Sequence, residues 1–554
     1  MKHFISSYLL LFLAICLSFT ACKKGITNPG KATAANGTNN LQDHAFTASS
    51  FLKVSGKVLK DNSGTGSVVN LRGTNLGSWL SQEAWIGPLG TGALNRLGWT
   101  ATASGTMTGT TTSAIFDNDL NTRWSTGIAQ APGQWLKIDM GSLRVFDQIG
   151  IDAGNFTTDY LRQYLVQTSA DGVNWTNVGS GTGAKFVSVN FGATQARYIL
   201  IYQQGTASDA YWSVAEVNAY MNDDTSLRNT FITRFGQPAA DNLLDTFQNV
   251  WITTSDLDKI KDMGMNMVRV PVYWRELMDD IGVMKSNAFT QLDWLSTQCT
   301  SRNLYIIIDL HGAPGGSDGY ITSGEAVNNN LWTTPAYQTM TVNIWKAIAT
   351  HFNGNPAIAA YDLLNEPVTS SSALSIKAFY NTLYTAIRAI DADHIICMQA
   401  FYNFDTLGSP TSNGWTNVLY QAHYYDTNTT NYAEQSGFID NNLADMDSHR
   451  QMWNVPVYAG EYNYWLFLDL WGKWMKGLNS HNMSWSNWTY KNMTTGNNWG
   501  FYQGNTNAVP DMNNDASATI TSKWSKFATS FFTVNQPLVD TVKKYTTVAA
   551  APLD

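Results

Sequence analysis

Cysteine and charge are scarce in this chain of 554 residues. Its four cysteines, Cys16, Cys22, Cys299 and Cys397, include no pair at the spacing of a metal site and are too few for a disulfide-rich scaffold. Charged residues make up 14% of the chain, and a formal net charge of −8 provides no basic surface for nucleic acid. We therefore expect no nucleic-acid partner. We expect Cys299 and Cys397 to be buried thiols, and the sequence leaves a bridge between them open.

Long apolar runs are also scarce, and the longest stands near the N-terminus, from Phe4 to Phe19. It has the length of a signal-peptide core and is short for a membrane span. It ends in Ser18-Phe19-Thr20-Ala21-Cys22, which resembles the lipobox of bacterial lipoproteins. The resemblance implies that residues 1–21 are removed and that lipid is attached to Cys22; an ordinary secretory signal is the alternative. Residues 22–46 are rich in Gly, Thr, Asn and Ala and predict a flexible tether. We expect a protein of the bacterial cell envelope that reaches the membrane only through its lipid anchor.

Aromatic residues, by contrast, are abundant: they form 13% of the chain and include 21 Trp and 25 Tyr. A buried core accounts for many of them. An excess of flat rings is also typical of clefts that bind sugars, because the C–H faces of a pyranose pack against them. A carbohydrate-active protein is therefore one of the classes to test.

Short apolar runs alternate with longer helical patterns over most of the chain, which predicts repeated βα units. Helical patterns such as Ser255–Met263, Thr341–His351 and Ser372–Asp391 separate the runs. Eight runs predict an α/β fold, a closed (β/α)8 TIM barrel built from residues 47–94 and 223–554. The eight predicted strands are Val68–Arg72, Asn266–Pro271, Leu304–Leu310, Ile358–Leu364, His394–Gln399, Val418–His423, Val455–Gly460 and Met483–Thr489.

Residues 95–222 interrupt this pattern after the first strand. They are rich in Thr, Ser and Gly and contain short alternating runs at 134–140, 164–169 and 197–202. Such runs, separated by turn signals, are typical of an all-β sandwich. Insertion is tolerated where the ends of a domain lie close together. We therefore expect an inserted all-β jelly-roll sandwich domain.

Two of the predicted strands end in a glutamate. One run closes with Asn365-Glu366-Pro367, and pairing should stop before Pro367 because proline cannot donate to a sheet. Another closes with Gly460-Glu461. The carboxyl ends of parallel barrel strands meet on one rim, where such folds place their chemistry. Glycoside hydrolysis needs two acids in such a place, one as proton donor and one as nucleophile or base.

Other polar and aromatic side chains also end predicted strands. Each one alone has an ordinary explanation, as an ion-pair partner, a core histidine or a packing residue. Together on one rim they are hard to explain by core packing. They are Arg269, His311, Asn365, His423, Tyr425 and Trp488.

These motifs resemble glycoside hydrolase family 5, the cellulase-like retaining enzymes, over about Phe51–Pro88 and Asn229–Val548. Residues 72–80 and 309–315 resemble the exo-β-1,3-glucanase branch of that family, except that Ser78 stands where the branch usually has glycine. The resemblance implies that Glu366 is the general acid/base and Glu461 the nucleophile. A retaining mechanism requires the two carboxyl groups to be about 5–5.5 Å apart.

The resemblance also implies supporting roles for the other rim residues. Arg269 and Tyr425 would favour the ionised form of the nucleophile. Asn365 would hold the sugar 2-hydroxyl, and His311 and His423 would orient carboxylates and substrate. Trp488 would form the floor under the departing sugar ring. Glu83 resembles a hydroxyl-binding acid of the glucanase branch, with an ordinary surface acid as the alternative.

The inserted segment resembles a discoidin-type (F5/8 type C) domain, which in sugar enzymes is a family 32 carbohydrate-binding module. The residues that carry this resemblance are 116–125, 132–135 and 212–217. It implies a structural calcium ion, since hard oxygen ligands suit calcium. The implied ligands are Asp117, Asp119, Thr122 and Glu216, and a simple Asx turn at the two aspartates is the alternative. No cofactor is expected for catalysis.

We therefore expect a retaining glycoside hydrolase that acts on β-glucan poly- or oligosaccharide, as an exo-β-1,3-glucosidase. An endo-acting β-1,4- or β-1,6-glucanase of the same family is the enzymatic alternative. A non-catalytic glycan-binding surface lipoprotein is the alternative from another class. A metal-dependent hydrolase is disfavoured because His311 and His423 lack a matching ligand cluster. The loops at 315–330 and 492–514 are candidates for closing one end of the cleft, which the sequence does not decide.

Overall fold

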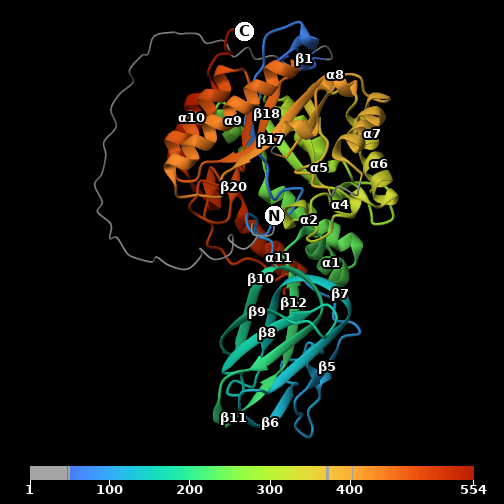
Figure 1. The fold of residues 1–554 in the computed structure, drawn as a ribbon, viewed down its shortest axis with the longest axis vertical. Helices are drawn as coiled ribbons and strands as arrows, with labels where there is room; N and C mark the ends of the chain where they lie inside the picture. The colour runs from blue at the N-terminus through green and yellow to red at the C-terminus, as the bar shows by residue number, and fades with distance from the viewer. Residues whose placement is uncertain (1–45, 48–49, 91, 370–373, 402, 554) are drawn as a thin grey trace, which may run out of the picture.

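The structure is a computed structural model that describes residues 46–47, 50–90, 92–369, 374–401 and 403–553. Cys22 and the predicted signal segment lie outside these residues, so lipidation stays a prediction. Within the described ranges, no helix is both long enough and apolar enough to cross a bilayer. Figure 1 shows a helix-covered barrel with an elongated β domain beyond one side of it.

Eight parallel strands close into a barrel in the order β13-β14-β15-β16-β17-β18-β19-β3, so the (β/α)8 prediction is confirmed. The strands are β3 (Arg72–Asn75), β13 (Met267–Tyr273), β14 (Tyr305–Gly312), β15 (Ile358–Asp362), β16 (Ile395–Gln399), β17 (Val418–Tyr425), β18 (Val457–Asn463) and β19 (Ser484–Asn487). The helices are α1 (Asp224–Phe235), α2 (Gln237–Trp251), α3 (Thr254–Asp262), α4 (Trp274–Leu277), α5 (Thr290–Thr300), α6 (Pro335–Phe352), α7 (Ile376–Arg388), α8 (Pro410–Asn413), α9 (Tyr432–Trp453), α10 (Leu468–Ser480), α11 (Ser517–Trp524) and α12 (Gln536–Thr546). A small sheet of β20 (Lys491–Asn492), β21 (Tyr502–Gln503) and β22 (Thr533–Val534) follows β19.

The first barrel strand begins later than Val68–Arg72, so that predicted boundary is wrong. Val69 donates its backbone N–H to Leu59, and Val68 bridges to Lys60. These two valines therefore extend the hairpin of β1 (Lys53–Ser55) and β2 (Val58–Lys60) instead of entering the barrel. A short apolar run has the same sequence pattern in a hairpin strand and in a barrel strand, and only its pairing partner distinguishes the two.

Apolar side chains fill the interior of the barrel on the side of the N-terminal hairpin. Leu52 and Leu59 from the hairpin belong to the same buried cluster as Leu71, Met267 and other strand residues. Cys397 is part of this cluster as a free thiol, and Cys299 is also free and buried, so the two are not bridged. The packed interior leaves the carboxyl ends of the strands as the place for polar side chains.

Close approach of two strands explains the glycine in β3. A Cβ atom at Gly73 would lie 2.0 Å from the carbonyl oxygen of Met267 in β13. Such a distance is far inside van der Waals contact, so only glycine lets β3 pair with β13 in this register. Barrel closure therefore depends on a residue without a side chain.

The chain between β3 and α1 forms an all-β domain, as predicted. A seven-stranded antiparallel sheet has the order β4-β12-β7-β10-β8-β9 with β5 paired to β7, and β11 and β6 form a second sheet. Trp124 and Trp212 of the small sheet pack in one core with Ile138 and Ile199 of the large sheet. The strands are β4 (Gly92–Ala93), β5 (Thr100–Ala103), β6 (Trp124–Gln130), β7 (Trp135–Asp152), β8 (Gln163–Ser169), β9 (Thr176–Thr182), β10 (Phe186–Gln203), β11 (Ala207–Val214) and β12 (Glu216–Met221).

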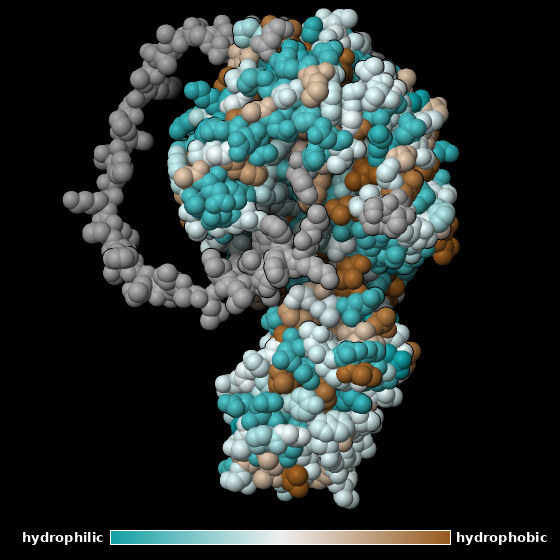
Figure 2. Space-filling view, in the orientation of Figure 1, coloured by the Kyte–Doolittle hydropathy of each residue, from teal (hydrophilic) through white to brown (hydrophobic). Residues whose placement is uncertain are grey.

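The junction after β12 is tied to two loops of the barrel. Asp223 caps α1 by accepting from Ser226, and its other carboxylate oxygen accepts the N–H of Ala326. Asp224 is fully buried and accepts the N–H of Gln82. Figure 2 shows a narrower waist between the barrel and the inserted domain, with hydrophilic residues spread over both. The exit of the inserted domain thus lies against loops that follow β3 and β14.

Candidate active site

Arg269 lies at the centre of the strand ends. It comes from β13, is fully buried, and its guanidinium contacts five side chains. Burial alone would lower the pKa of Arg269. The charges of the surrounding acids outweigh burial and keep this pKa well above its usual range. Nε donates to Asp362 at 2.8 Å, Nη1 to Asn75 and Glu461 at 3.0 Å each, and Nη2 to Asn365 at 3.0 Å, while Nη2 also pairs with Asp309 at 3.0 Å.

Glu461 accepts a hydrogen bond on each carboxylate oxygen. Oε1 accepts from Arg269, and Oε2 accepts from the hydroxyl of Tyr425 at 2.9 Å. Burial raises the pKa of Glu461 above its usual range, and the charge of Arg269 opposes this rise without cancelling it. Two donors that bind only the carboxylate favour the ionised form. These two donors therefore offset part of the cost of a buried carboxylate at Glu461 in β18.

The hydrogen bonds of His423 fix which of its ring nitrogens carries the proton. Nε2 faces the amide nitrogens of Gln399 at 2.7 Å and Gln421 at 3.0 Å, and an amide nitrogen can only donate. Nε2 is thus the acceptor, and Nδ1–H donates to Oε1 of Glu366 at 2.7 Å. Burial lowers the pKa of His423 to about 3, so the ring is neutral at neutral pH.

Glu366 has a backbone conformation that is rare for a residue other than glycine. Its φ is 39°, which costs about 1–3 kcal/mol. Its N–H donates to Oε1 of Gln399 at 2.8 Å, so one glutamine holds both the backbone of Glu366 and the ring of His423. Burial raises the pKa of Glu366 to about 7; the charges of Glu83 and Asp309 add to this, and those of His311 and Arg269 oppose it. A carboxyl group with that pKa suits an acid that later acts as a base.

The carboxylates of Glu366 and Glu461 lie close together. One carboxylate oxygen of each, together with a ring nitrogen of His423, lie within 4.8 Å of one another. Retaining enzymes place the carboxyl groups about 5–5.5 Å apart, whereas inverting enzymes need about 6.5–9.5 Å to admit a water molecule. The arrangement therefore allows direct attack by one carboxylate on the anomeric carbon.

The same three residues form the one group in the described part of the chain with the spacing of a metal site. His423, however, already uses both ring nitrogens, one as donor to Glu366 and one as acceptor from two amides. Binding a metal would require that network to break. The hydrogen bonds of His423 therefore favour a metal-free site in which the histidine orients Glu366.

His311 and Trp488 form a stacked pair beside the glutamates. Their ring centroids are 5.3 Å apart, with an angle of 11° between the planes. Nδ1 of His311 bonds to Asp309 at 2.6 Å, and Nε2 lies 3.6 Å from Oε1 of Glu83. Burial alone would lower the pKa of His311, but Asp309 and Glu83 raise it to about 10. One face of Trp488 is covered by a charged imidazolium, which leaves the other face or the ring edge for a sugar.

Glu83 is buried, which excludes an ordinary surface acid. It is 3% exposed, and Oε2 accepts from the indole N–H of Trp85 at 2.5 Å. Oε1 makes no hydrogen bond with any described residue. Ser78 has a φ of 56°, which accounts for glycine at this position in the family it resembles. Its Oγ accepts the N–H of Glu83 at 3.2 Å, so serine adds a contact that glycine cannot make.

Several residues of the site were missed by the sequence analysis. Trp499 lies between Trp85 and Trp465, with ring centroids 5.0 Å from each, and 5.9 Å from Tyr425. Trp85 and Trp499 are half-buried and offer aromatic surface next to Glu83 and Glu461. Both sit on loops, so no strand end pointed to them. The supporting amides Asn75, Gln399 and Gln421 were also missed, although Asn75 and Gln399 end barrel strands and could have been noticed.

The predicted calcium ligands lie in the inserted domain, and each of the three acids already accepts a hydrogen bond on at least one carboxylate oxygen. Asp117 accepts from the N–H of Asp119 and the hydroxyl of Thr122, and Asp119 accepts from Asn121. Glu216 is paired with Arg96. In the described residues these three acids do not bring their oxygens together as a metal site would. The arrangement fits the Asx turn, and binding calcium would require Arg96 to leave Glu216.

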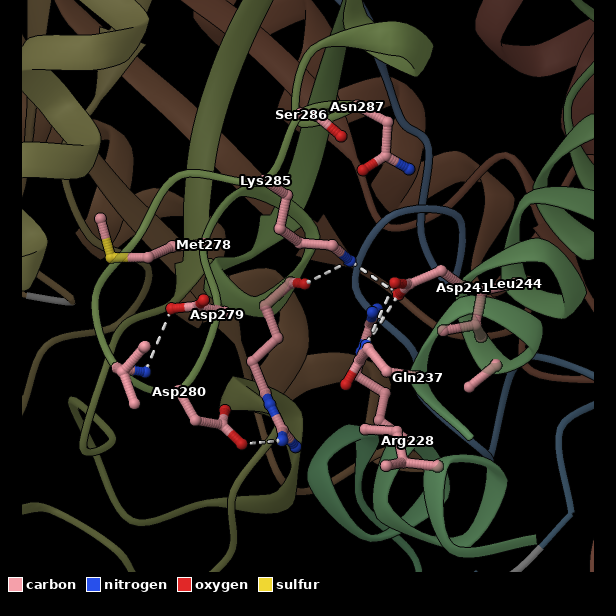
Figure 3. Close-up of a pocket in the computed structure, with 14 residues that line it drawn as sticks. Arg228, Gln237, Asp241, Leu244, Met278, Asp279, Asp280, Lys285, Ser286 and Asn287 are labelled. Atoms are coloured by element: carbon pink, nitrogen blue, oxygen red, sulfur yellow. Dashed lines mark hydrogen bonds and ion pairs between the residues drawn. The ribbon is translucent and has the colours of Figure 1, made fainter. Parts of the chain in front are cut away.

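A cavity of about 500 Å³ lies away from the glutamates, between α1, α2 and the segment that follows β13. Figure 3 shows Lys285 reaching Asp241, and an arginine reaching Asp280. The second ion pair is Arg275–Asp280, and Gln237 also donates to Asp241. The charges that line the cavity are neutralised by each other, so we assign it no ligand.

Two known domain families match this chain. Residues 229–494 match the family described as Cellulase (glycosyl hydrolase family 5), and residues 100–217 match the F5/8 type C domain. A family 32 carbohydrate-binding module of NanJ from C. perfringens, solved in complex with galactose, is 25% identical and covers 24% of this chain and 98% of its own, with a TM-score of 0.22.

Curated proteins are similar over part of their length. A β-xylosidase of Phanerodontia chrysosporium is 29% identical over 219 residues, which are 38% of this chain and 45% of that protein. A glucan 1,3-β-glucosidase of Candida oleophila is 27% identical over 207 residues, which are 35% of this chain and 48% of that protein. The chain thus spans about half the length of these relatives.

Proposed function

We propose that this chain, whose residues 229–494 match the glycosyl hydrolase family 5 model and whose residues 100–217 match the F5/8 type C domain, is a retaining β-glucosidase that releases glucose from the end of a β-1,3-glucan. The observation that carries the proposal is the pair Glu366 and Glu461. One carboxylate oxygen of each lies within 4.8 Å of the other, and the two carboxyl groups have different surroundings. The β-1,3 linkage is supported by relatives named glucan 1,3-β-glucosidase, among them those of Candida oleophila and Pichia angusta.

The first chemical step uses the two carboxyl groups in opposite roles. An oxygen of Glu461 attacks the anomeric carbon and forms a glycosyl ester. The bond from that carbon to the leaving oxygen breaks as Glu366 gives its proton to that oxygen. Arg269 and Tyr425 keep Glu461 ionised for the attack. His423 donates to one oxygen of Glu366 and leaves the other oxygen to carry the proton.

The second step reverses the role of Glu366. Esterified Glu461 has lost its charge, so Arg269 is less neutralised and lowers the pKa of Glu366, which becomes a base. Glu366 takes a proton from water as the water oxygen attacks the anomeric carbon and frees Glu461. Oδ1 of Asn365 accepts a hydrogen bond from Arg269, and the amide nitrogen of Asn365 makes no hydrogen bond in the described chain. That nitrogen is therefore available to a sugar hydroxyl.

A timed product profile on β-1,3-, β-1,4- and β-1,6-glucan tests the proposal, with Glu461→Ala as the control. We expect glucose as the sole early product from the β-1,3 polymer, first seen as the β-anomer by NMR, and no turnover in the variant. A ladder of oligosaccharides or activity only on another linkage would overturn the substrate assignment. Unchanged turnover in Glu461→Ala would overturn the mechanism.

We also propose that Asp117, Asp119, Thr122 and Glu216 bind a structural calcium ion when Arg96 moves aside. Chelation of the metal-loaded protein with EDTA should then lower the unfolding temperature of the inserted domain, and Asp117→Asn should abolish that response. An unfolding temperature that calcium and EDTA leave unchanged would contradict the proposal.

The localisation that we propose is a bacterial cell envelope, with the protein held by lipid on Cys22. Labelled palmitate should enter the wild-type protein, which should sediment with membranes after expression in a bacterium. Cys22→Ser should lose both properties. A Cys22→Ser protein that still carries label would refute this assignment.

A further inference from the structure

A cavity of about 520 Å³ lies where the inserted domain meets the barrel, and we call it the seam cavity. Its walls come from β7, β12 and Phe186 of the domain, and from Pro510–Asn514 and Gly90 of the barrel. Figure 1 shows β7, β10 and β12 at the side of the domain that faces the barrel, close to α1 and α11. The cavity is separate from Glu366 and Glu461, which do not line it.

Two neighbouring strands present alternate residues to the seam cavity. In β12 the lining residues are Glu216, Asn218 and Tyr220, and in β7 they are Gln148, Gly150 and Asp152. The residues between them, such as Val217 and Ile151, belong to the core of the domain. The lining residues are also direct partners across the sheet: Glu216 with Asp152, Asn218 with Gly150, and Tyr220 with Gln148. One continuous face of the sheet therefore forms a wall of the cavity.

Two aromatic rings lie over a glycine on this face. A Cβ atom at Gly150 would be 3.1 Å from the ring of Tyr220 and 3.4 Å from the ring of Phe186. Phe186 is 52% exposed, which is unusual for so large an apolar side chain. The missing side chain at Gly150 lets both rings lie close to the strand and leaves flat surface open to a ligand.

Polar groups on the same face lack partners. Oε1 of Glu216 is buried and unbonded in the described chain, and the residue is only 5% exposed. The hydroxyl of Tyr220 and the side-chain amide of Asn218 also make no hydrogen bond with described residues. Burial and the charges of Asp511, Asp152 and Glu216 raise the pKa of Tyr220, so its hydroxyl keeps its proton and can donate. These unmet donors and acceptors face a space large enough for a ligand.

The chemistry of the lining selects among ligands. The carboxylates of Asp152, Glu216 and Asp511 exclude an anion, and their oxygens do not converge on one point as a metal would require. Amides and rings suit a neutral ligand with many hydroxyl groups and apolar C–H faces. We propose that the seam cavity binds a neutral oligosaccharide segment, with a sugar ring on Tyr220 and Phe186 and sugar hydroxyl groups bonded to the side-chain amide of Asn218 and the hydroxyl of Tyr220. This site goes beyond the proposed function and does not depend on the linkage that the barrel cleaves.

Calorimetric titration of the full chain with Glu461→Gln tests the site without hydrolysis. The probes are β-1,3-glucohexaose, β-1,4-glucohexaose and β-1,4-galactotriose. We expect two binding events for at least one probe, one at the glutamates and one at the seam cavity. Adding Asn218→Ala and Tyr220→Ala should remove the second event or weaken it at least about tenfold, as expected for loss of an aromatic anchor. Gln148→Trp, which fills the cavity instead of emptying it, should have the same effect.

Tyr211→Ala is the matched control, because Tyr211 is an exposed ring on the other sheet of the domain. It should keep both events, and all variants should unfold at the temperature of the parent. The proposal is overturned if the cavity variants retain both events, if only Tyr211→Ala loses one, or if the parent shows a single event with every probe. Turnover of an aryl β-glucoside by the active protein, with Glu461 intact, should be unchanged by Asn218→Ala, so failure of the seam cavity and failure of the catalytic assignment give different results.

Discussion

At the scale of single residues, the proposed mechanism gives the two glutamates different roles, and their hydrogen-bond donors differ accordingly. Glu461 receives a charged donor and a hydroxyl, whereas Glu366 receives one neutral imidazole N–H. Gln399 fixes that imidazole and the backbone of Glu366 together. The same two side chains in a symmetric environment would share one proton and could not hold separate roles.

The pH dependence of turnover should follow Glu366. Its pKa is about 7, and the first step needs its protonated form, so kcat/KM should fall about tenfold per pH unit above that value. Steady-state rates on a glucan between pH 5 and pH 9 measure this limb. A substrate with a 2,4-dinitrophenyl leaving group needs no proton, and its glycosylation rate should stay flat over the same range. A limb that persists with that substrate would assign the ionisation to another group.

The two glutamates could be predicted from the sequence because each follows an apolar run and is flanked by residues of a recognisable motif. The glutamine side chains that help to orient the two glutamates were not predicted. Gln421 contributes through a side chain that fits only because Gly460 has none: a Cβ at Gly460 would lie 2.4 Å from its amide nitrogen. That relation links residues on β17 and β18 and cannot be read along one segment.

At the scale of elements, the barrel closes through β3, which pairs with β13 and β19. Eight strands could be predicted because each is a separate apolar run, and the three helical stretches named from the sequence overlap α3, α6 and α7. The start of β3 could not, because Val68 and Val69 pair with a hairpin close in sequence and only the following residues cross to β13. The apolar sequence pattern therefore predicts that a strand is present, whereas pairing with distant strands determines the residue at which it begins.

Gly73→Ala should weaken barrel closure. The new methyl group would meet the Met267 carbonyl, and overpacking of this kind costs about 1–3 kcal/mol or more. Urea unfolding followed by tryptophan fluorescence measures the change. Gly437→Ala in α9 is the matched control, since nothing lies within 4 Å of its Cβ position, and it should be neutral or stabilising by up to about 1 kcal/mol. Equal stability of both variants would contradict the close approach of β3 and β13.

At the scale of the whole molecule, the exit of the inserted domain is joined to the site through Asp224. Its carboxylate pairs with Arg228 and accepts the N–H of Gln82, the residue before Glu83. Arg228 also pairs with Glu276, so the network joins α1 to the segment after β13. The domain is therefore anchored at the rim that carries the chemistry.

Asp224→Ala should lower both stability and substrate affinity. It leaves Arg228 buried with one partner fewer, at a cost of about 3 kcal/mol, and releases the loop that carries Glu83. Chemical denaturation and KM for a glucan oligosaccharide measure the two effects. Asp209→Ala, an exposed acid of β11, should change neither. A stable Asp224→Ala protein with unchanged KM would contradict the coupling of the domain junction to the loop that carries Glu83.

The position of the insert after β3 also sets an order of events during synthesis. Asn75 and Arg269, which meet in the finished barrel, are 194 residues apart, and Asn75 bonds to Asn487 still later in the chain. The β domain pairs only its own strands, so it can complete its sheets on the ribosome while β3 still has no neighbour. A nascent chain released before β19 would present β3 with one open edge, and the barrel interior with it, to chaperones and proteases.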